Sequence, residues 1–383
     1  MSSSPTSVIP RPILDWLRGH TEDDLPTPRP TPAAALKWTI DEWSLQLELM
    51  SGRMRVPDGG FRRRLRSELS EAWELYQERG WLDDPLSYHR TPPPGLPNLE
   101  SQRESALGLP FEHLRFTSEF EPWPNEPGRD RWEAYQPVKT GHAWMLRHAG
   151  APRPWIVLVN GYRTGTPAID LGSFRAGHLH TDLGLNVIGV VLPLHGPRAV
   201  GPTGSRVLHA GAMNTMFTLA QGAWDVRRVI NYLRDEYEAP AVGLSGISLG
   251  GNMVSLVSSL QDDLACVIAG VPEADLVRGL RRQLDPQLPP FYEQWGLSWD
   301  PLEKVLGVAS PMSLACKVPH NRRYIYGGLL DRWVRPGNVR DLWKHWDEPS
   351  ILWYEGSHLS FPLEPSVRRY IDDALIESFD LKP

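Results

Sequence analysis

The sequence predicts an α/β protein, with a doubly wound, mostly parallel sheet that carries a helical lid insertion and an N-terminal helical arm. From about residue 154 onward, apolar runs alternate with helix-like stretches. Such runs are typical of strands buried on both faces, and their alternation with helices is the pattern of a parallel sheet with crossover connections. The alternation breaks once, in a segment rich in Pro and aromatic residues. Before the strands begin, the chain reads as helical up to a Pro-rich stretch at 90–98.

These observations divide the chain into three parts. Residues 1–30 form an irregular arm, 31–100 an N-terminal helical extension, and 107–383 the main α/β domain. The lid insertion lies inside that domain, at about 274–309.

Composition limits the class of protein. The 383 residues are 41% hydrophobic and 22% charged, which is ordinary for a globular chain, and the formal net charge of −6 argues against a nucleic-acid partner. The two cysteines, Cys266 and Cys316, lie in apolar surroundings and are expected as reduced thiols in a cytoplasmic protein. No run of about 18 apolar residues occurs, so no transmembrane segment is expected.

Two helices are predicted in the N-terminal extension. Thr31 can cap the first and Pro32 fits its first turn; the second follows Asp58 and ends at Gly80. The first repeats apolar residues on one face at Leu36, Ile40, Trp43 and Leu47. The second does so at Phe61, Leu65, Leu69, Trp73 and Tyr76. We expect a helical hairpin laid against the main domain.

The main domain is predicted element by element. Strands are expected at 112–120, 135–148 (one strand or a bent hairpin), 154–160, 186–192, 241–247, 265–270, 323–326 and 350–354. Helices are expected at 168–181, 212–236, after Ser248, at 338–346 and at 364–379. Strands separated by helices imply right-handed crossovers in one sheet.

One turn in this pattern carries chemistry. Gly246-Ile247-Ser248-Leu249-Gly250 lies between a strand and a helix, which is the setting of a G-x-S-x-G nucleophile elbow. A serine at so sharp a turn has a strained backbone and needs small neighbours, which Gly246 and Gly250 supply. The motif is short enough to occur by chance in a structural turn, so its meaning depends on partners elsewhere in the chain.

The partners are a base and an acid, because a serine hydroxyl is a weak nucleophile until a base takes its proton. In the doubly wound hydrolase arrangement they follow the serine in the order acid, then histidine, each just after a strand. Asp331 and His358 stand in those two places. The carboxyl ends of the strands gather at one edge of such a sheet. Glu273 and Asp275, which follow the strand after the elbow helix, remain alternative acids.

With these residues, the chain from about 112 to 380 resembles the α/β-hydrolase superfamily of serine esterases and lipases. The resemblance implies that 107–383 is a catalytic domain with a catalytic triad in which Ser248 is the nucleophile, Asp331 the acid and His358 the base. It also implies an oxyanion hole formed by the backbone N–H groups of Leu249 and Tyr162. Many members have His-Gly before the second donor, whereas this chain has Asn160-Gly161.

No cofactor or metal is expected. The histidines lack the spacing of a zinc motif, and His178 and His180 read as a surface pair. His195 ends a predicted strand on the active-site side, where it can shape the pocket or serve only in the turn.

The expected function is a serine hydrolase that cleaves a small-molecule carboxylic ester through an acyl-enzyme on Ser248. The aromatic residues of the lid indicate an apolar acyl or alcohol group; they are Phe291, Tyr292, Trp295 and Trp299. A thioesterase, peptidase or amidase would use the same triad. A further alternative is a non-catalytic binding protein on this fold, with the helical arm as its docking element.

Overall fold

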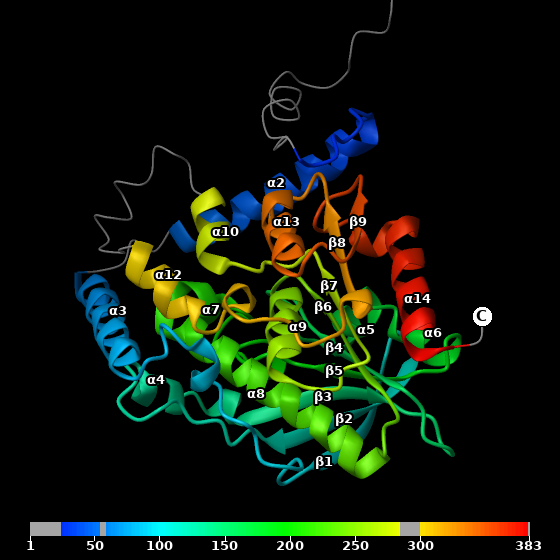
Figure 1. The fold of residues 1–383 in the computed structure, drawn as a ribbon, viewed down its shortest axis with the longest axis horizontal. Helices are drawn as coiled ribbons and strands as arrows, with labels where there is room; N and C mark the ends of the chain where they lie inside the picture. Colours follow the sequence, from blue (N-terminus) through cyan, green and yellow to red (C-terminus); the bar gives the residue numbers. More distant parts are fainter. Residues whose placement is uncertain (1–23, 54–58, 284–298, 382–383) are drawn as a thin grey trace, which may run out of the picture.

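The computed structural model of the protein describes residues 24–53, 59–283 and 299–381. Within these residues, nine strands form one sheet in the order β1-β2-β3-β5-β4-β6-β7-β8-β9 (Figure 1). The first three strands are β1 (Glu100–Ala106), β2 (Leu109–Thr117) and β3 (Thr140–Leu146). The others are β4 (Trp155–Val159), β5 (Asn186–Val190), β6 (Val242–Ile247), β7 (Cys266–Gly270), β8 (Arg323–Gly328) and β9 (Ser350–Tyr354).

The sheet is antiparallel at one edge and parallel elsewhere. The pairs β1–β2, β2–β3 and β3–β5 are antiparallel. Every further pair across the sheet, from β5–β4 to β8–β9, is parallel. The parallel strands therefore all end at the same edge, where their following loops meet. Ser248, Asp331 and His358 each follow one of these strands, namely β6, β8 and β9.

Helices cover both faces of the sheet. On one face lie α8 (Ala212–Tyr237), α9 (Leu249–Leu260) and α13 (Pro336–His345); on the other lie α5 (Pro167–Ser173), α6 (Ala176–Thr181) and α14 (Pro365–Phe379). The shorter helices are α4 (Arg129–Glu133), α7 (Ser205–His209), α10 (Leu276–Gln283) and α12 (Trp299–Gly307). In β4, Val157 and Val159 belong to the first apolar layer, whereas Ile156 and Leu158 belong to the second. A strand buried on both faces explains its uninterrupted apolar sequence.

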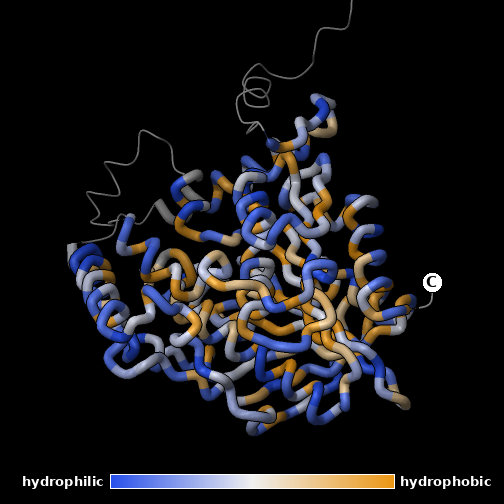
Figure 2. Tube along the Cα trace, in the orientation of Figure 1, coloured by the Kyte–Doolittle hydropathy of each residue, from blue (hydrophilic) through white to orange (hydrophobic). Residues whose placement is uncertain are grey.

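Hydropathy follows this layering. In Figure 2 the apolar colours gather along the central strands, while polar colours dominate the outer helices. Each fully buried Val, Leu or Ile side chain stabilises the fold by about 1.5–3 kcal/mol relative to exposure. The main domain is therefore held together by the two apolar layers that flank the parallel strands.

The strands and helices predicted for the main domain are present, with ends shifted by a few residues, except for the single helix expected at 168–181. It is two helices, Pro167–Ser173 and Ala176–Thr181, because the left-handed backbone of Arg175 (φ 51°) interrupts it. The sequence reading missed β1, because this edge strand is polar and largely exposed. Since β1 pairs with β2 along its full length, the sheet begins at Glu100, before the predicted domain start at 107.

The predicted N-terminal helices are α2 (Pro32–Arg53) and α3 (Gly59–Glu78), but the expected hairpin is wrong, because the two helices do not pack side by side (Figure 1). The helix α3 buries Leu69 and Tyr76 and contacts α8 and α12. The helix α2 lies instead near α13 and the ends of β8 and β9 (Figure 1). Its apolar stripe faces outward, with exposed fractions of 62%, 49%, 68% and 56% for Leu36, Ile40, Trp43 and Leu47. Asp58, the proposed cap of α3, lies outside the described residues.

The predicted lid falls partly outside the described residues, which stop at 283 and resume at 299. Its two described ends are the helices α10 and α12, which contact each other. Of its four aromatic residues only Trp299 is described, and the Arg281 guanidinium lies 4.9 Å from its ring centre. The lid remains a prediction.

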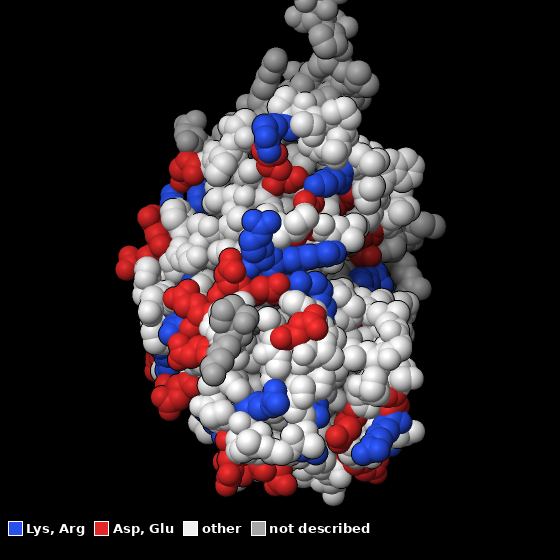
Figure 3. All heavy atoms as spheres, turned by 90° about the vertical axis from the view of Figure 1, so that its right-hand side faces the viewer, with Lys and Arg blue, Asp and Glu red and all other residues white. Residues whose placement is uncertain are grey.

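The charges on the visible surface are mixed. The face shown in Figure 3 carries Lys and Arg side chains interspersed with Asp and Glu. Among the helices that the structure describes, none combines the length and apolarity needed to cross a bilayer.

Candidate active site

Ser248 lies at a sharp turn between β6 and α9. Its backbone has φ 59° and ψ −116°, a conformation that costs a non-glycine residue about 1–3 kcal/mol. The turn is so tight that a Cβ at Gly246 would collide with the carbonyl oxygen of Gly250, and a Cβ at Gly250 would collide with the carbonyl oxygen of Val159. The two glycines of the motif are therefore required by close backbone approach.

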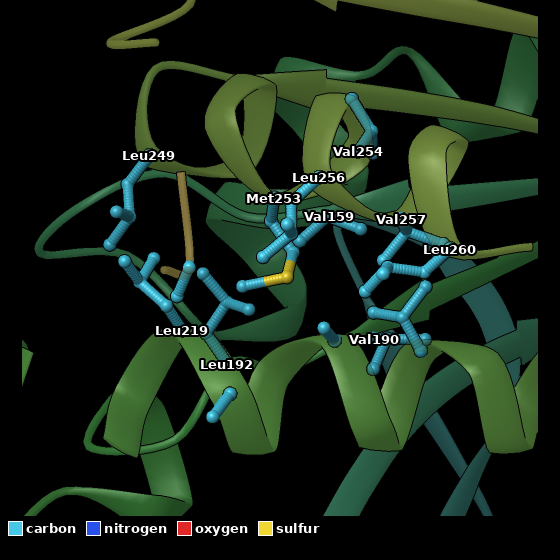
Figure 4. Close-up of a cluster of buried hydrophobic side chains, with 14 of the residues drawn as sticks. Val159, Val190, Leu192, Leu219, Leu249, Met253, Val254, Leu256, Val257 and Leu260 are labelled. Carbon is cyan, nitrogen blue, oxygen red and sulfur yellow. The ribbon is translucent and has the colours of Figure 1, made fainter. Parts of the chain in front are cut away.

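The elbow is held in place from both sides. The backbone N–H of Ser248 donates to the carbonyl of Gly270 (2.9 Å), and its carbonyl accepts from the N–H of Asn252 (3.0 Å). Behind it, apolar side chains of α9 pack with Leu219 of α8 and with Val159 and Val190 of the sheet (Figure 4). This buried layer compensates for the strained turn and fixes Ser248 at the edge of the sheet.

Asp331 and His358 form a buried pair at the same edge. The Nδ1 atom of His358 donates to Oδ2 of Asp331 at 2.7 Å, and the side chain of Asp331 is fully buried. The other oxygen, Oδ1, accepts from the backbone N–H groups of Trp333 (2.8 Å) and Val334 (2.7 Å). The indole of Trp333 stacks on the imidazole with ring centres 6.2 Å apart. Because Nδ1 is engaged, Nε2 is the ring nitrogen left to act as a base.

The two alternative acids have other partners. The carboxylate of Glu273 accepts from Nδ2 of Asn338 at 2.9 and 3.0 Å. Asp275 accepts from the backbone N–H of Arg278 (2.9 Å) at the start of α10. The structure thus brings His358 together with Asp331, as the sequence order predicts.

Burial and charge set the protonation of this pair. Burial alone would lower the pKa of His358, but the nearby carboxylates of Asp331 and Asp41 outweigh it and raise the pKa above its usual range. Burial also raises the pKa of Asp331, against the opposing effect of the imidazole. The arrangement favours the imidazolium that a general base becomes after accepting a proton.

The loop after β4 lies beside the elbow. A Cβ on Gly161 would be 3.2 Å from the carbonyl oxygen of Ile247 and 3.6 Å from the Cβ of Ser248, so this loop touches the nucleophile turn directly. Asn160 fixes the loop: its Oδ1 accepts from the N–H of Leu192 (2.9 Å), and its Nδ2 donates to the carbonyl of Gly161 (3.0 Å). The Asn160-Gly161 departure from the family pattern therefore has a structural role of its own.

The two expected oxyanion donors flank this contact. Leu249 is the first residue of α9, where N–H groups have no partner within the helix. Tyr162 follows Gly161, and its hydroxyl donates to Oε1 of Glu48 at 2.8 Å. Burial and this carboxylate raise the pKa of the Tyr162 phenol.

Sequence reasoning missed the part played by α2. Glu48 also accepts from the Arg163 guanidinium at 2.7 and 2.9 Å, and Asp41 accepts from the backbone N–H of His358 at 2.6 Å. One trace of it is visible in the sequence: Asp41, Ser44 and Glu48 recur every three or four residues and so share one side of the helix, beside the apolar stripe. It passed unnoticed because an apolar stripe is normally the buried face of a helix.

Two other histidines that the sequence singles out, His195 and His178, have structural partners. His195 is fully buried after β5, with Nδ1 at 2.9 Å from the carbonyl of Pro193 and its ring against Tyr162. Burial lowers its pKa to about 4, so it is neutral at pH 7, and it lies in the turn behind the loop that carries Tyr162. His178 pairs with Asp182 and Asp372. No group of metal-binding side chains occurs among the described residues.

The sheet order and the strand-turn-helix elbow define an α/β-hydrolase fold, and known proteins bear this out. Acetyl xylan esterase 1 from Thermoanaerobacterium sp. JW/SL YS485 matches with a TM-score of 0.52 at 16% identity, over 85% of this chain and 98% of that one. An acetyl xylan esterase from Paenibacillus sp. R4 matches with a TM-score of 0.50 at 13% identity, over 76% and 98%. Identities this low establish the fold alone.

The sequence comparisons reach closer relatives. No protein-family model matches the chain. Two uncharacterized proteins of Mycobacterium tuberculosis, MT2702 of strain CDC 1551 and Rv2627c of strain H37Rv, are 38% identical over 368 residues, covering 95% of this chain and 87% of theirs. The chain belongs to one family with these mycobacterial proteins, and its fold is that of the α/β-hydrolases.

Proposed function

We propose that the protein is a serine hydrolase that cleaves a carboxylic ester through an acyl-enzyme on Ser248. The observation that carries the proposal is the joint placement of a strained elbow serine and a buried His358–Asp331 pair at one edge of the sheet. Together they supply a nucleophile, its base and the acid that orients the base.

The reaction proceeds in two halves. Oγ of Ser248 attacks the ester carbonyl carbon while Nε2 of His358 takes its proton, and Asp331 stabilises the resulting imidazolium. The proton then passes to the leaving alkoxide, which departs as the alcohol. Water attacks the acyl-enzyme, again giving its proton to His358, and the carboxylic acid leaves as Ser248 regains a proton.

The carbonyl oxygen carries the developing negative charge. The backbone N–H groups of Leu249 and Tyr162 are the proposed donors, because one opens α9 and the other follows the loop that touches the elbow. Each such donor contributes about 3 kcal/mol to the barrier reduction in well-measured cases.

An ester is the proposed substrate because an alkoxide leaves more readily than an amine. Thioesters and amides would use the same groups, so the test is a panel of p-nitrophenyl esters from acetyl to dodecanoyl with matched thioesters and anilides. Ester turnover that disappears in Ser248→Ala supports the proposal. Turnover confined to thioesters or anilides would move the assignment to those classes, and equal turnover by Ser248→Ala would refute a serine mechanism.

A binding role is favoured by one observation, the outward apolar stripe of α2. If Ser248→Ala keeps the biological phenotype while removal of residues 1–100 abolishes it, the binding role gains over catalysis. The cytosol remains the proposed location, in keeping with the two unpaired cysteines, Cys266 and Cys316.

A further inference from the structure

We infer that helix α2 belongs to the catalytic apparatus and that Asp41 is a positioning residue, which holds the loops carrying His358 and Asp331 against each other. This inference rests on the proposed function, because it assigns Asp41 a role in the same site.

The contacts of Asp41 carry the argument. Its side chain is fully buried, and its Oδ2 accepts from the backbone N–H of His358 at 2.6 Å and from that of Arg332 at 3.3 Å. Its Oδ1 accepts from the N–H of Leu359 at 3.1 Å. The Asp41 carboxylate thus joins Arg332, the residue after Asp331, to His358. Charge-assisted bonds to backbone N–H groups are short and directional, so they fix the spacing of the two loops.

Other side chains of α2 repeat this pattern at the neighbouring loops. Oγ of Ser44 accepts from the indole N–H of Trp333 at 2.7 Å, and Trp333 is the residue that stacks on His358. At the far end of the helix, Glu48 binds Tyr162 and Arg163 of the oxyanion loop. Through these hydrogen bonds the helix contacts the loops that carry Asp331, His358 and Tyr162, three of the four segments that hold proposed catalytic groups; the fourth is the Ser248 elbow.

The buried face of α2 combines packing with polar contacts. Ala34 and Leu45 are buried on it at 5% and 6% exposure, as in a helix that covers a domain. Asp41 lies on the same face at 0% exposure, whereas the stripe of Leu36, Ile40, Trp43 and Leu47 is exposed. An unpaired buried carboxylate would be costly, so its presence is explained by the N–H groups that it binds.

Asp41 also places a second negative charge beside His358. Together with Asp331, it favours the protonated imidazole against the effect of burial. The other charged and titratable groups around the pair are Lys37 and Glu42 from α2, Arg332 and Arg335 from the acid loop, and Tyr354, Glu355 and Glu364 around the base loop. Replacing Asp41 by a neutral residue is therefore expected to lower the pKa at which His358 titrates.

The experiment compares full-length wild type with Asp41→Asn and Asp41→Ala on the best ester of the panel, from pH 5 to 9. A backbone displacement of about 1 Å at a catalytic group can cost on the order of 100-fold. We expect kcat to fall about 10-fold in Asp41→Asn and about 100-fold in Asp41→Ala, with KM changed less than threefold. The acid-side midpoint of kcat/KM should move down by roughly half a pH unit or more in both variants.

The matched control is Leu36→Gln on the exposed face of the same helix. Leu36 is 62% exposed, and none of the hydrogen bonds from α2 to the proposed catalytic loops comes from its side chain. This variant changes α2 without removing those bonds or a charge, so kcat and the midpoint should stay near wild type. Thermal unfolding of each variant separates a loss of folding from a loss of positioning. If Asp41→Ala does not fold, the acid-side midpoint of kcat/KM in Asp41→Asn decides whether the inference holds.

Two outcomes overturn the inference. One is Asp41→Asn activity within threefold of wild type; the other is a loss of activity with an unmoved midpoint, which would mean that Asp41 only anchors the helix. Either result leaves the proposed function intact if wild type turns over esters and Ser248→Ala does not. A wild type without any turnover would instead count against the proposed function.

Discussion

Asp331→Asn tests the orientation of the base. In the native site Oδ1 of Asp331 accepts from the N–H groups of Trp333 and Val334, and Oδ2 accepts from Nδ1 of His358. The two backbone donors require an oxygen, so the asparagine must turn its NH2 group toward His358. Nδ1 then has to accept, which puts the ring proton on Nε2, where it blocks proton transfer from Ser248.

The expected cost of this reversed hydrogen bond is about 10⁴-fold in kcat, the loss that the wrong tautomer causes in a serine protease triad. That corresponds to about 5 kcal/mol of transition-state stabilisation. Steady-state kinetics on the best ester substrate measure it, with thermal unfolding as a check that the variant folds. Because asparagine has the same shape, the unfolding temperature should change little.

The matched control for this substitution is Glu273→Gln, at the alternative acid. Glu273 accepts from Asn338 and not from His358 in the described contacts, so this variant should keep kcat within a few-fold of wild type. If Asp331→Asn retained a tenth of the activity, or if Glu273→Gln were equally damaging, the assignment of Asp331 as the acid would be wrong.

Three further outcomes are expected. In wild type, kcat/KM should fall as the pH drops through the raised pKa of His358, with a midpoint above about 6.5; a midpoint well below 6 would contradict this. Gly250→Ala should lose more than about 4 kcal/mol in urea unfolding, since the new Cβ collides with the Val159 carbonyl; a near-native midpoint would disprove the close approach. Arg198→Met should lose about 3–5 kcal/mol, because it strands the buried Asp225 carboxylate 2.8 Å away. Burial raises the pKa of Asp225, so the folded state binds this proton more tightly than the unfolded state does. The Arg198→Met variant should therefore regain stability as the pH falls. A loss of unfolding free energy that stays constant with pH would argue against a charged Asp225.

The sequence predicted the sheet and the pairing of His358 with Asp331 because both depend on local, periodic signals. Apolar runs mark doubly buried strands such as β4, and parallel strands bring their carboxyl ends to one edge whatever their order. Knowing that Asp331 and His358 follow two such strands was enough to expect them to meet.

The role of α2 could not be predicted in the same way. Its apolar stripe at Leu36, Ile40, Trp43 and Leu47 indicates a buried face by the usual rule, but the structure exposes it. The inward face buries Ala34 and Leu45 together with Asp41, which accepts from the N–H groups of His358 and Leu359, more than 300 residues away in the chain. The recurrence of Asp41, Ser44 and Glu48 marks one side of a helix, but it does not indicate which distant loop that side contacts. The polar edge strand β1 escaped prediction for a related reason, since its place in the sheet depends on β2.

The most direct test of the central claim is covalent labelling of Ser248 by a fluorophosphonate, read by intact mass and peptide mapping. The account predicts one adduct per chain, located on Ser248 and absent from Ser248→Ala, with labelling that slows strongly in Asp331→Asn. A folded wild-type protein that stays unlabelled, or an adduct that persists in Ser248→Ala, would contradict it.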